Sequence, residues 1–193
     1  MYRKVAVVLL SLTVLALLSV AVISSPVVDP PTVDAAQTND PSTILMRITG
    51  AGQGEISGGS TQRGHEGWIE VVGLAHEIVS PRDAASGLPT GKRQHKPFVI
   101  TKEIDKSTPL LFSALAHNEN LTRILLEFFQ TDPTTGKEVA YTIELRNASI
   151  AGIQTEDEAH EIREHVSFVY QKIIWTWVDG GITSEDDWET PVT

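Results

Sequence analysis

The stretch Gly91-Lys-Arg-Gln-His-Lys-Pro-Phe-Val-Ile-Thr-Lys-Glu-Ile-Asp-Lys-Ser-Thr-Pro-Leu-Leu111 decides the fold, because it joins a turn, a strand and the start of a helix without a gap. The run from Val99 to Ile104 alternates polar and apolar side chains and therefore predicts a strand. Ser107 or Thr108 can cap the helix that follows. Pro109 is tolerated in the first turn, because the amide that proline lacks would have no intrahelical partner there.

The predicted helix runs from Pro109 to about His117 and carries one apolar face. That face consists of Leu110, Leu111, Ala114 and Leu115. A stripe of this kind is typical of a helix that packs against a core.

From about Ser42 the chain is otherwise typical of β structure. The expected strands span 44–48, 68–79, 121–129, 139–153 and 166–178, and residues 131–137 have the turn chemistry of a hairpin. Several long strands with one helix, and no alternation of strand and helix, favour a mainly β fold. We expect an antiparallel sandwich or barrel with the helix on its flank.

The last predicted strand changes phase in its middle. Val166, Phe168 and Tyr170 share one face, whereas Ile173, Trp175 and Trp177 share the other. This pattern indicates a bulge near Gln171–Lys172 or a strand that is buried on both faces. The sequence Asp179-Gly-Gly181 is expected to end the strand, and an acidic tail follows it.

The N-terminus predicts export. Arg3 and Lys4 precede an uncharged apolar run from Val5 to Ile23, and a polar, proline-rich stretch follows. We expect a signal peptide or membrane anchor over 1–25, a linker over 26–41 and one domain over 42–193. In either case the positive charges stay in the cytoplasm and the domain crosses the membrane. The protein is then secreted or periplasmic, or it is held at the membrane by an uncleaved segment. Translation from Met46 is a third reading, and it would trim the first strand.

Composition excludes several classes of function. The 193 residues contain no cysteine, which removes disulfides, thiolate metal sites and cysteine nucleophiles. The net charge of −10 argues against nucleic acid as the main partner, since neutralising phosphates requires a basic face.

Three motifs resemble catalytic or ligand-binding sites but lack the required spacing. His160 and His165 are five residues apart, one too many for a zinc-protease helix. The stretch 87–92 is one residue short of a phosphate loop. The acidic residues Glu156, Asp157, Glu158, Glu161 and Glu164 lack the spacing of a calcium loop, and we interpret them as a solvated loop. The sequence therefore predicts no catalytic residue, no metal site and no cofactor.

Two groups of residues are candidates for contacts with other molecules. Lys92, Arg93, His95 and Lys96 form a basic patch, which could guard a strand edge or meet an acidic surface on another copy of the chain. Trp175 and Trp177 could stack on a sugar or base, although alternating aromatics more often form a core between sheets or subunits. The long stretch 80–91 has the composition of an interaction loop.

Four blocks in order resemble the haemolysin-coregulated proteins, the tube subunits of bacterial type VI secretion systems. The blocks are Glu77-Ile-Val-Ser-Pro-Arg-Asp83, the stretch 91–111, Tyr170-Gln-Lys-Ile-Ile-Trp-Thr-Trp177 and Asp179-Gly-Gly-Ile-Thr-Ser-Glu-Asp-Asp-Trp188. The resemblance implies a β-barrel of two antiparallel sheets with one flanking helix. It also implies a non-enzymatic subunit that forms six-membered rings, stacked into a hollow tube inside a contracting sheath. Sheath, spike and effector proteins would be the partners.

On this reading, ring and stacking contacts involve Arg82, Asp83, Lys92, Arg93, His95, Lys96, Trp175 and Trp177. An exported binding module on the same barrel, which contacts a glycan or a protein, is the alternative. A hydrolase that uses the acidic residues is a third hypothesis.

Overall fold

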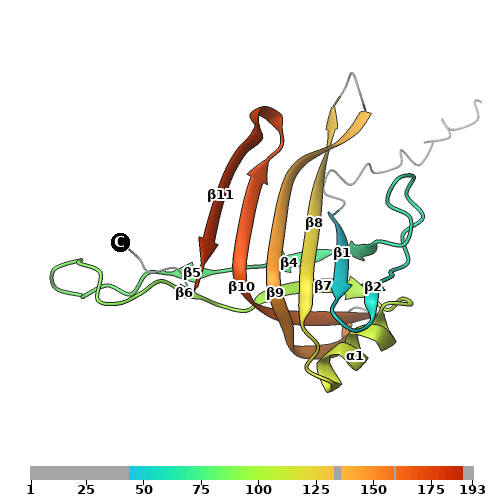
Figure 1. Ribbon diagram of the computed structural model, residues 1–193, viewed down its shortest axis with the longest axis horizontal. Coiled ribbons are helices and arrows are strands. Elements are labelled where there is room, and N and C mark those ends of the chain that lie inside the picture. The colour runs from blue at the N-terminus through green and yellow to red at the C-terminus, as the bar shows by residue number, and fades with distance from the viewer. Residues whose placement is uncertain (1–43, 133–135, 159, 189–193) are drawn as a thin grey trace, which may run out of the picture. The chain divides into compact units, whose positions relative to one another are not determined.

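The computed structural model describes residues 44–132, 136–158 and 160–188, and this part is mainly β with one helix (Figure 1). The segments expected over 1–25 and 26–41 lie outside the described residues. Within the described part, no helix combines the length and the apolar character that a bilayer crossing requires.

The elements follow one another in the order expected for a β domain with a single helix. They are β1 (Ile44–Gly50), β2 (Gly54–Ile56), β3 (Ile69–Val71), β4 (Gly73–Ala75), β5 (Ile78–Val79), β6 (Gln94–His95), β7 (Phe98–Glu103), α1 (Thr108–Ala116), β8 (Leu121–Asp132), β9 (Gly136–Glu158), β10 (Glu161–Trp177), the 3-10 turn η1 (Asp179–Gly181) and β11 (Ile182–Asp187). The helix and the hairpin between β8 and β9 are therefore confirmed.

Nine of the described strands form one antiparallel sheet, and β5 and β6 form a second, two-stranded sheet. The main sheet runs in the order β2-β1-β8-β9-β10-β7-β4, with β3 on β1 and β11 on β10. The mainly β, antiparallel fold with one helix is confirmed, but the main sheet does not close into a barrel, because no ladder between the described strands joins its two edges. The edges come near each other at Val72, whose amide donates to the carbonyl of Thr101 on β7.

The predicted strand over 68–79 is divided into three because the chain changes partners along it. β3 pairs with β1, and β4 then pairs with β7. Beyond β4 the chain leaves the main sheet and enters the small sheet as β5.

The core lies between the inner faces of the curved sheet and helix α1. Leu111 and Ala114 of the helix are buried, while Leu110 and Leu115 pack partly against the core, as the sequence predicted. On β7 and β10 the cross-strand pair Phe98 and Phe168 is fully buried. Each such pair of aromatic rings removes a large apolar area from water.

A buried ion pair continues this inward-facing row. Lys102 lies directly across from Glu164, and the Lys102 Nζ to Glu164 Oε2 distance is 2.9 Å. Nζ is also 3.0 Å from Asp105 Oδ1, and Thr108 donates its hydroxyl to Glu164 Oε2. The pair therefore connects β7 and β10 to the N-terminus of α1. The prediction that Glu164 belongs to a solvated loop was wrong.

The other acidic residues of that segment also lie in strands. Glu156, Asp157 and Glu158 belong to the end of β9, and Glu161 begins β10, so the two strands form a long hairpin. Sequence reasoning ended these strands early because charged residues carry no apolar alternation. Hydrogen bonding to neighbouring strands extends them.

The phase change in β10 is confirmed at the expected position, because burial passes from Val166, Phe168 and Tyr170 to Ile173, but the bulge lies elsewhere. The register with β9 shifts between Ser167 and Phe168, several residues before the predicted site. β10 pairs with β7 up to Phe168 and with β11 from Lys172 onward. The neighbour of β10 on this side therefore changes in the same part of the strand where the buried side changes.

The acidic tail forms a strand that the sequence did not predict. After η1 the chain reverses, and β11 pairs with β10 in antiparallel register from Lys172–Asp187 to Trp177–Ile182. Gly180 and Gly181 have φ of 79° and 64°, a left-handed conformation that glycine adopts without strain and that the reversal requires.

Candidate functional site

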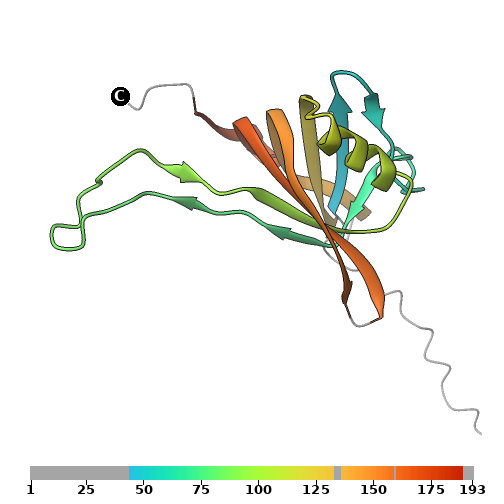
Figure 2. The same ribbon diagram turned by 90° about the horizontal axis from the view of Figure 1, so that it is seen from below.

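The most prominent surface feature is a long hairpin over residues 78–95, which we call the arm. It consists of β5, the connecting segment 80–93 and β6, and it projects away from the main sheet (Figure 2). Most of its side chains are exposed, and Leu88 is 65% exposed. A projecting, solvent-facing hairpin of this length is typical of an element that contacts another molecule.

Local hydrogen bonds shape the tip of the arm. Asp83 accepts hydrogen bonds from the amide and the hydroxyl of Ser86, and these bonds lower the pKa of its carboxyl. Arg82 donates to the carbonyl of Gly87 at 3.1 Å and forms an isolated bridge with Pro89. Arg82 and Asp83 thus stabilise the tip, and their role in subunit contacts stays a prediction.

The arm joins the main sheet through the arm-base cluster, which we define as His76, Arg93, His95, Tyr170 and Asp186. The Tyr170 hydroxyl lies 2.7 Å from both His76 Nε2 and His95 Nδ1. His95 Nε2 lies 2.7 Å from Asp186 Oδ2, and Arg93 makes a two-pronged contact with the same carboxylate. Four separate parts of the chain therefore meet at the point where the arm begins.

The hydrogen-bond chemistry of the cluster fixes one donor. Because a carboxylate only accepts, His95 donates from Nε2 to Asp186. The Tyr170 hydroxyl lies between His95 Nδ1 and His76 Nε2 and connects the two imidazoles.

Burial and charge shift the pKa values of this cluster. Burial lowers the pKa of His76, and the nearby His95 lowers it further. Burial raises the pKa of Tyr170, and the charge of Asp186 adds to that effect. Burial opposes the ionisation of Asp186, but hydrogen bonds from Arg93 and His95 outweigh it and hold its pKa below the usual value. Asp186 therefore stays charged and Tyr170 stays protonated at neutral pH.

The lowered pKa of His76 predicts acid sensitivity. The unfolded chain takes up this proton more readily than the folded domain, so stability is complete above the unfolded pKa of about 6.5 and falls as the pH drops below it. His76→Gln keeps a hydrogen-bond donor and removes the titration. We expect urea unfolding of the variant to depend less on pH between about 7.5 and 5. His160→Asn, at an exposed position with φ of 74°, is the control and should retain the full dependence.

The structure separates the other predicted contact residues. Lys92 and Lys96 are exposed, and neither ammonium group has an ion-pair partner in the described part of the chain. Arg93 and His95 belong instead to the arm-base cluster. Sequence reasoning had placed these two residues in one basic patch with the two lysines. The free cations at the root of the arm are therefore Lys92 and Lys96.

The two tryptophans have different surroundings although they share a strand. Trp175 is half-buried and packs against the core, whereas Trp177 is 41% exposed. Trp177 lines an open hollow of about 420 Å3 together with Gln130, Glu138 and Asp179. Of these two tryptophans Trp177 is the more exposed, and its part in contacts with another molecule stays a prediction.

Sequence reasoning missed His76, Tyr170 and Asp186. Asp186 lies in a segment without apolar periodicity, so no signal marked it as part of a strand. His76 shares the phase of Trp68, Val72 and Leu74, which was its only indication. Tyr170 shares the phase of Val166 and Phe168, and this predicted burial but not its two histidine partners.

Comparisons with known proteins agree on one family. The family described as "Type VI secretion system effector, Hcp" matches residues 45–177. The chain is 41% identical over 164 residues to the "Major exported protein" of Pseudomonas aeruginosa strain PAO1, and the match covers 76% of this chain and 95% of that protein.

Solved structures show the same fold. The Hcp1 protein from E. coli EAEC 042 has a TM-score of 0.71 at 30% identity, covering 76% of this chain and 98% of its own. The secreted protein Hcp3 from Pseudomonas aeruginosa has a TM-score of 0.66 at 34% identity, covering 77% and 99%. The order of strands, the single helix and these matches lead to one conclusion. The chain belongs to the Hcp family of type VI secretion proteins.

Proposed function

We propose that this chain is an exported, non-catalytic structural subunit that assembles into rings of six copies, which stack into a hollow tube. The observation that carries this proposal is the arm, which projects from the sheet with Leu88 exposed and with Lys92 and Lys96 at its root. An element that projects in this way has few contacts within its own subunit. Contacts with a neighbouring copy would bury its apolar side chains.

A head-to-tail contact closes into a ring when its rotation divides a full turn, and stacking then uses a second surface along the axis. We assign the arm and the cations Lys92 and Lys96 to this axial surface. The chain carries a net charge of −10, so a neighbouring copy offers acidic side chains with which these cations can pair. Opposite charges would steer stacking and make it sensitive to salt.

The N-terminal segment belongs to the proposal as well. We propose that residues 1–25 act as a signal peptide and 26–41 as a linker, and that the domain over 42–193 works after export. The name of the 41% identical relative, "Major exported protein", supports export rather than retention at a membrane. Effectors carried in the lumen, together with sheath and spike proteins, are the partners we propose.

Particle size tests the assembly directly. The purified protein is expected to sediment as a hexamer and to appear as rings in negative-stain images, with stacks at low salt. A monomer at every protein concentration and ionic strength would overturn ring formation.

The axial assignment has its own test, in which Lys92→Glu is combined with Lys96→Glu. Arg93 is unsuitable for this test because its guanidinium forms an ion pair with Asp186 within the same subunit. We expect rings to persist while stacking at low salt falls, because the substitution puts like charges against the acidic face. Arg63→Glu with Lys106→Glu makes the same change in net charge at exposed positions away from the arm and should leave stacking intact. Equal loss in both variants would mean that total charge, not the arm, controls stacking.

A second candidate function is an exported binding module that uses the hollow beside Trp177. This function is supported by the exposed indole of Trp177, which lines a hollow of about 420 Å3. A soluble glycan or peptide that quenches tryptophan fluorescence in the parent but not in Trp177→Ala would favour it. Such a module would bind equally well as a monomer, which separates it from the ring.

A further inference from the structure

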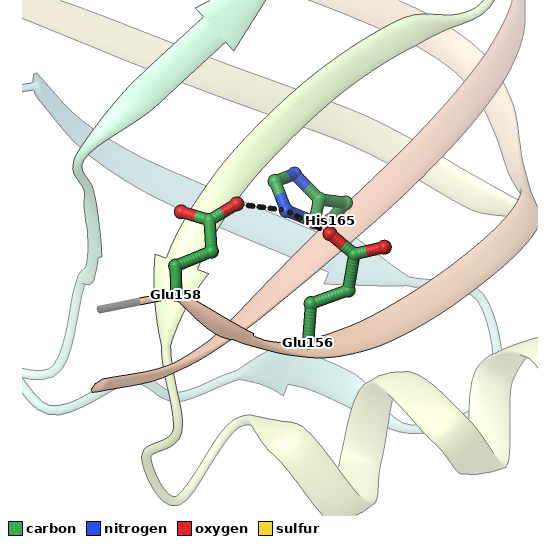
Figure 3. A group of neighbouring side chains, drawn as sticks. All are labelled: Glu156, Glu158 and His165. Carbon is green, nitrogen blue, oxygen red and sulfur yellow. Dashed lines mark hydrogen bonds and ion pairs between the residues drawn. The ribbon is translucent and has the colours of Figure 1, made fainter. Parts of the chain in front are cut away.

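We propose that Glu156, Glu158 and His165 form a binding site for a divalent transition-metal cation of the zinc type. These three residues converge from the ends of β9 and β10 (Figure 3). One ligand atom from each lies within 4.8 Å of the others. The site is distinct from the arm and does not depend on ring formation.

The sheet places these side chains on one face. Successive residues of a strand point to opposite sides, so Gln154, Glu156 and Glu158 share a side of β9. His165 lies directly across from Gln154 in the β9–β10 ladder and therefore shares that side. Glu164 points to the opposite side and is buried against Lys102. The hairpin thus separates a structural carboxylate from two carboxylates that face solvent.

The spacing of the ligand atoms fits a tetrahedral ion. His165 Nε2 is 3.0 Å from Glu158 Oε1 and 3.7 Å from Glu156 Oε2. Ligands at about 2.0–2.2 Å from a zinc ion are roughly 3.3–3.6 Å apart when the geometry is tetrahedral. The two observed distances lie on either side of that separation, so a small adjustment of the long glutamate side chains would place all three atoms around one ion.

Each of the three proposed ligands also contacts another protein group through its second polar atom. Thr101 hydroxyl is 3.0 Å from His165 Nδ1, which leaves Nε2 directed at the carboxylates. Gln154 donates to Glu156 Oε1, and Arg163 Nε lies 3.9 Å from Glu158 Oε2. In both glutamates the other oxygen is the one turned toward His165. Partners that orient the ligands in this way are characteristic of metal sites, and they raise affinity.

The charge and the space at this site suit a cation. Glu156, Glu158 and Glu161 bring three carboxylates, against the single guanidinium of Arg163 that contacts two of them. The site borders an open hollow of about 570 Å3 lined also by Gly152 and Ser167. Water could complete the coordination from this side. An imidazole with two carboxylates is a donor set that zinc accepts readily, whereas calcium prefers oxygen ligands alone.

Metal titration of the full-length, untagged chain tests the proposal. Co2+ is the probe, because its visible absorption reports the coordination geometry, and Zn2+ is then added to displace it. We expect one Co2+ per chain, a tetrahedral spectrum and displacement by Zn2+. Binding should weaken as the pH falls, because protons compete with a metal ion for its ligand atoms.

Variants distinguish this site from incidental binding. His165→Gln should abolish the spectrum, and Thr101→Val, which removes only the supporting hydroxyl, should weaken binding by about 10–100-fold. His160→Asn changes a neighbouring, exposed histidine and should bind as the parent does.

Circular dichroism confirms that each variant is folded. The proposal is overturned if the parent binds no Co2+ at neutral pH. It is also overturned if His165→Gln binds as the parent does, or if His160→Asn abolishes binding. In these cases the three residues form only an exposed ion-pair cluster.

Discussion

Lys102→Met is expected to lower the free energy of unfolding by about 3–5 kcal/mol at neutral pH, because it leaves the carboxylate of Glu164 buried without its counter-charge. The side chains of Lys102 and Glu164 are only 1% and 2% exposed. Glu164 Oε1 has no hydrogen-bond partner in the described structure, so the remaining support after substitution is the Thr108 hydroxyl. Urea unfolding at neutral pH measures the loss.

The pH dependence of this variant identifies the cause. A stranded carboxylate can avoid the cost of burial by taking up a proton, so the loss should be smaller near pH 4 than near pH 7. Lys102→Met combined with Glu164→Leu removes both charges and should recover much of the stability, because well-packed apolar groups often replace a buried ion pair without loss. A double variant as unstable as the single one would show that packing volume, and not the unpaired charge, is responsible.

Asp186→Ala is expected to destabilise the domain by about 2–3 kcal/mol, because it removes the acceptor of charge-assisted hydrogen bonds from Arg93 and His95. The effect should concentrate in the arm, since both donors lie at its C-terminal end. We therefore expect backbone amides of residues 78–95 to exchange with deuterium faster than in the parent. Amides of the buried β7 and β8 should change much less.

Glu185→Ala is the matched control for this prediction. It removes a neighbouring carboxylate of the same strand, whose ion pair with Lys172 at 2.7 Å is exposed. Exposed pairs contribute about 0–1 kcal/mol, so exchange in the arm should stay as in the parent. Equal exchange of the arm in the parent and in Asp186→Ala would show that the arm-base cluster does not hold the arm.

The local pattern of the chain was sufficient for much of the fold. Alternation over 99–104, the helix start at Ser107–Thr108 and the turn at 131–137 each predicted an element that the structure contains. The expected side-chain cap was wrong, because Ser107 donates its hydroxyl to Asp105 and makes no capping hydrogen bond. These signals depend on residues a few positions apart, so they can be recognised without knowing where the chain goes next. They do not determine whether the two edges of the sheet pair with each other. The main sheet stays open and does not form a closed barrel.

The candidate sites were less predictable because their members are far apart along the chain. The basic patch at Lys92–Lys96 was recognised from its charge, but its division into two free lysines and two arm-base residues depends on Asp186. The ligands Glu156 and Glu158 were interpreted as part of a solvated loop. Strand pairing brings them beside His165, and a search for helical or loop spacing does not detect that arrangement.

By itself, the sequence determined the class of fold, the position of the helix, the resemblance to one family and the presence of a long connecting segment over 80–91. All of these follow from local periodicity, turn chemistry and short motifs. Only the tertiary structure decided that Glu164 is buried with Lys102, that Asp186 holds the base of the arm, and that two carboxylates and an imidazole meet on one face of a hairpin. The reason is that strand register, which no local pattern specifies for charged residues, sets which side chains meet and which face water.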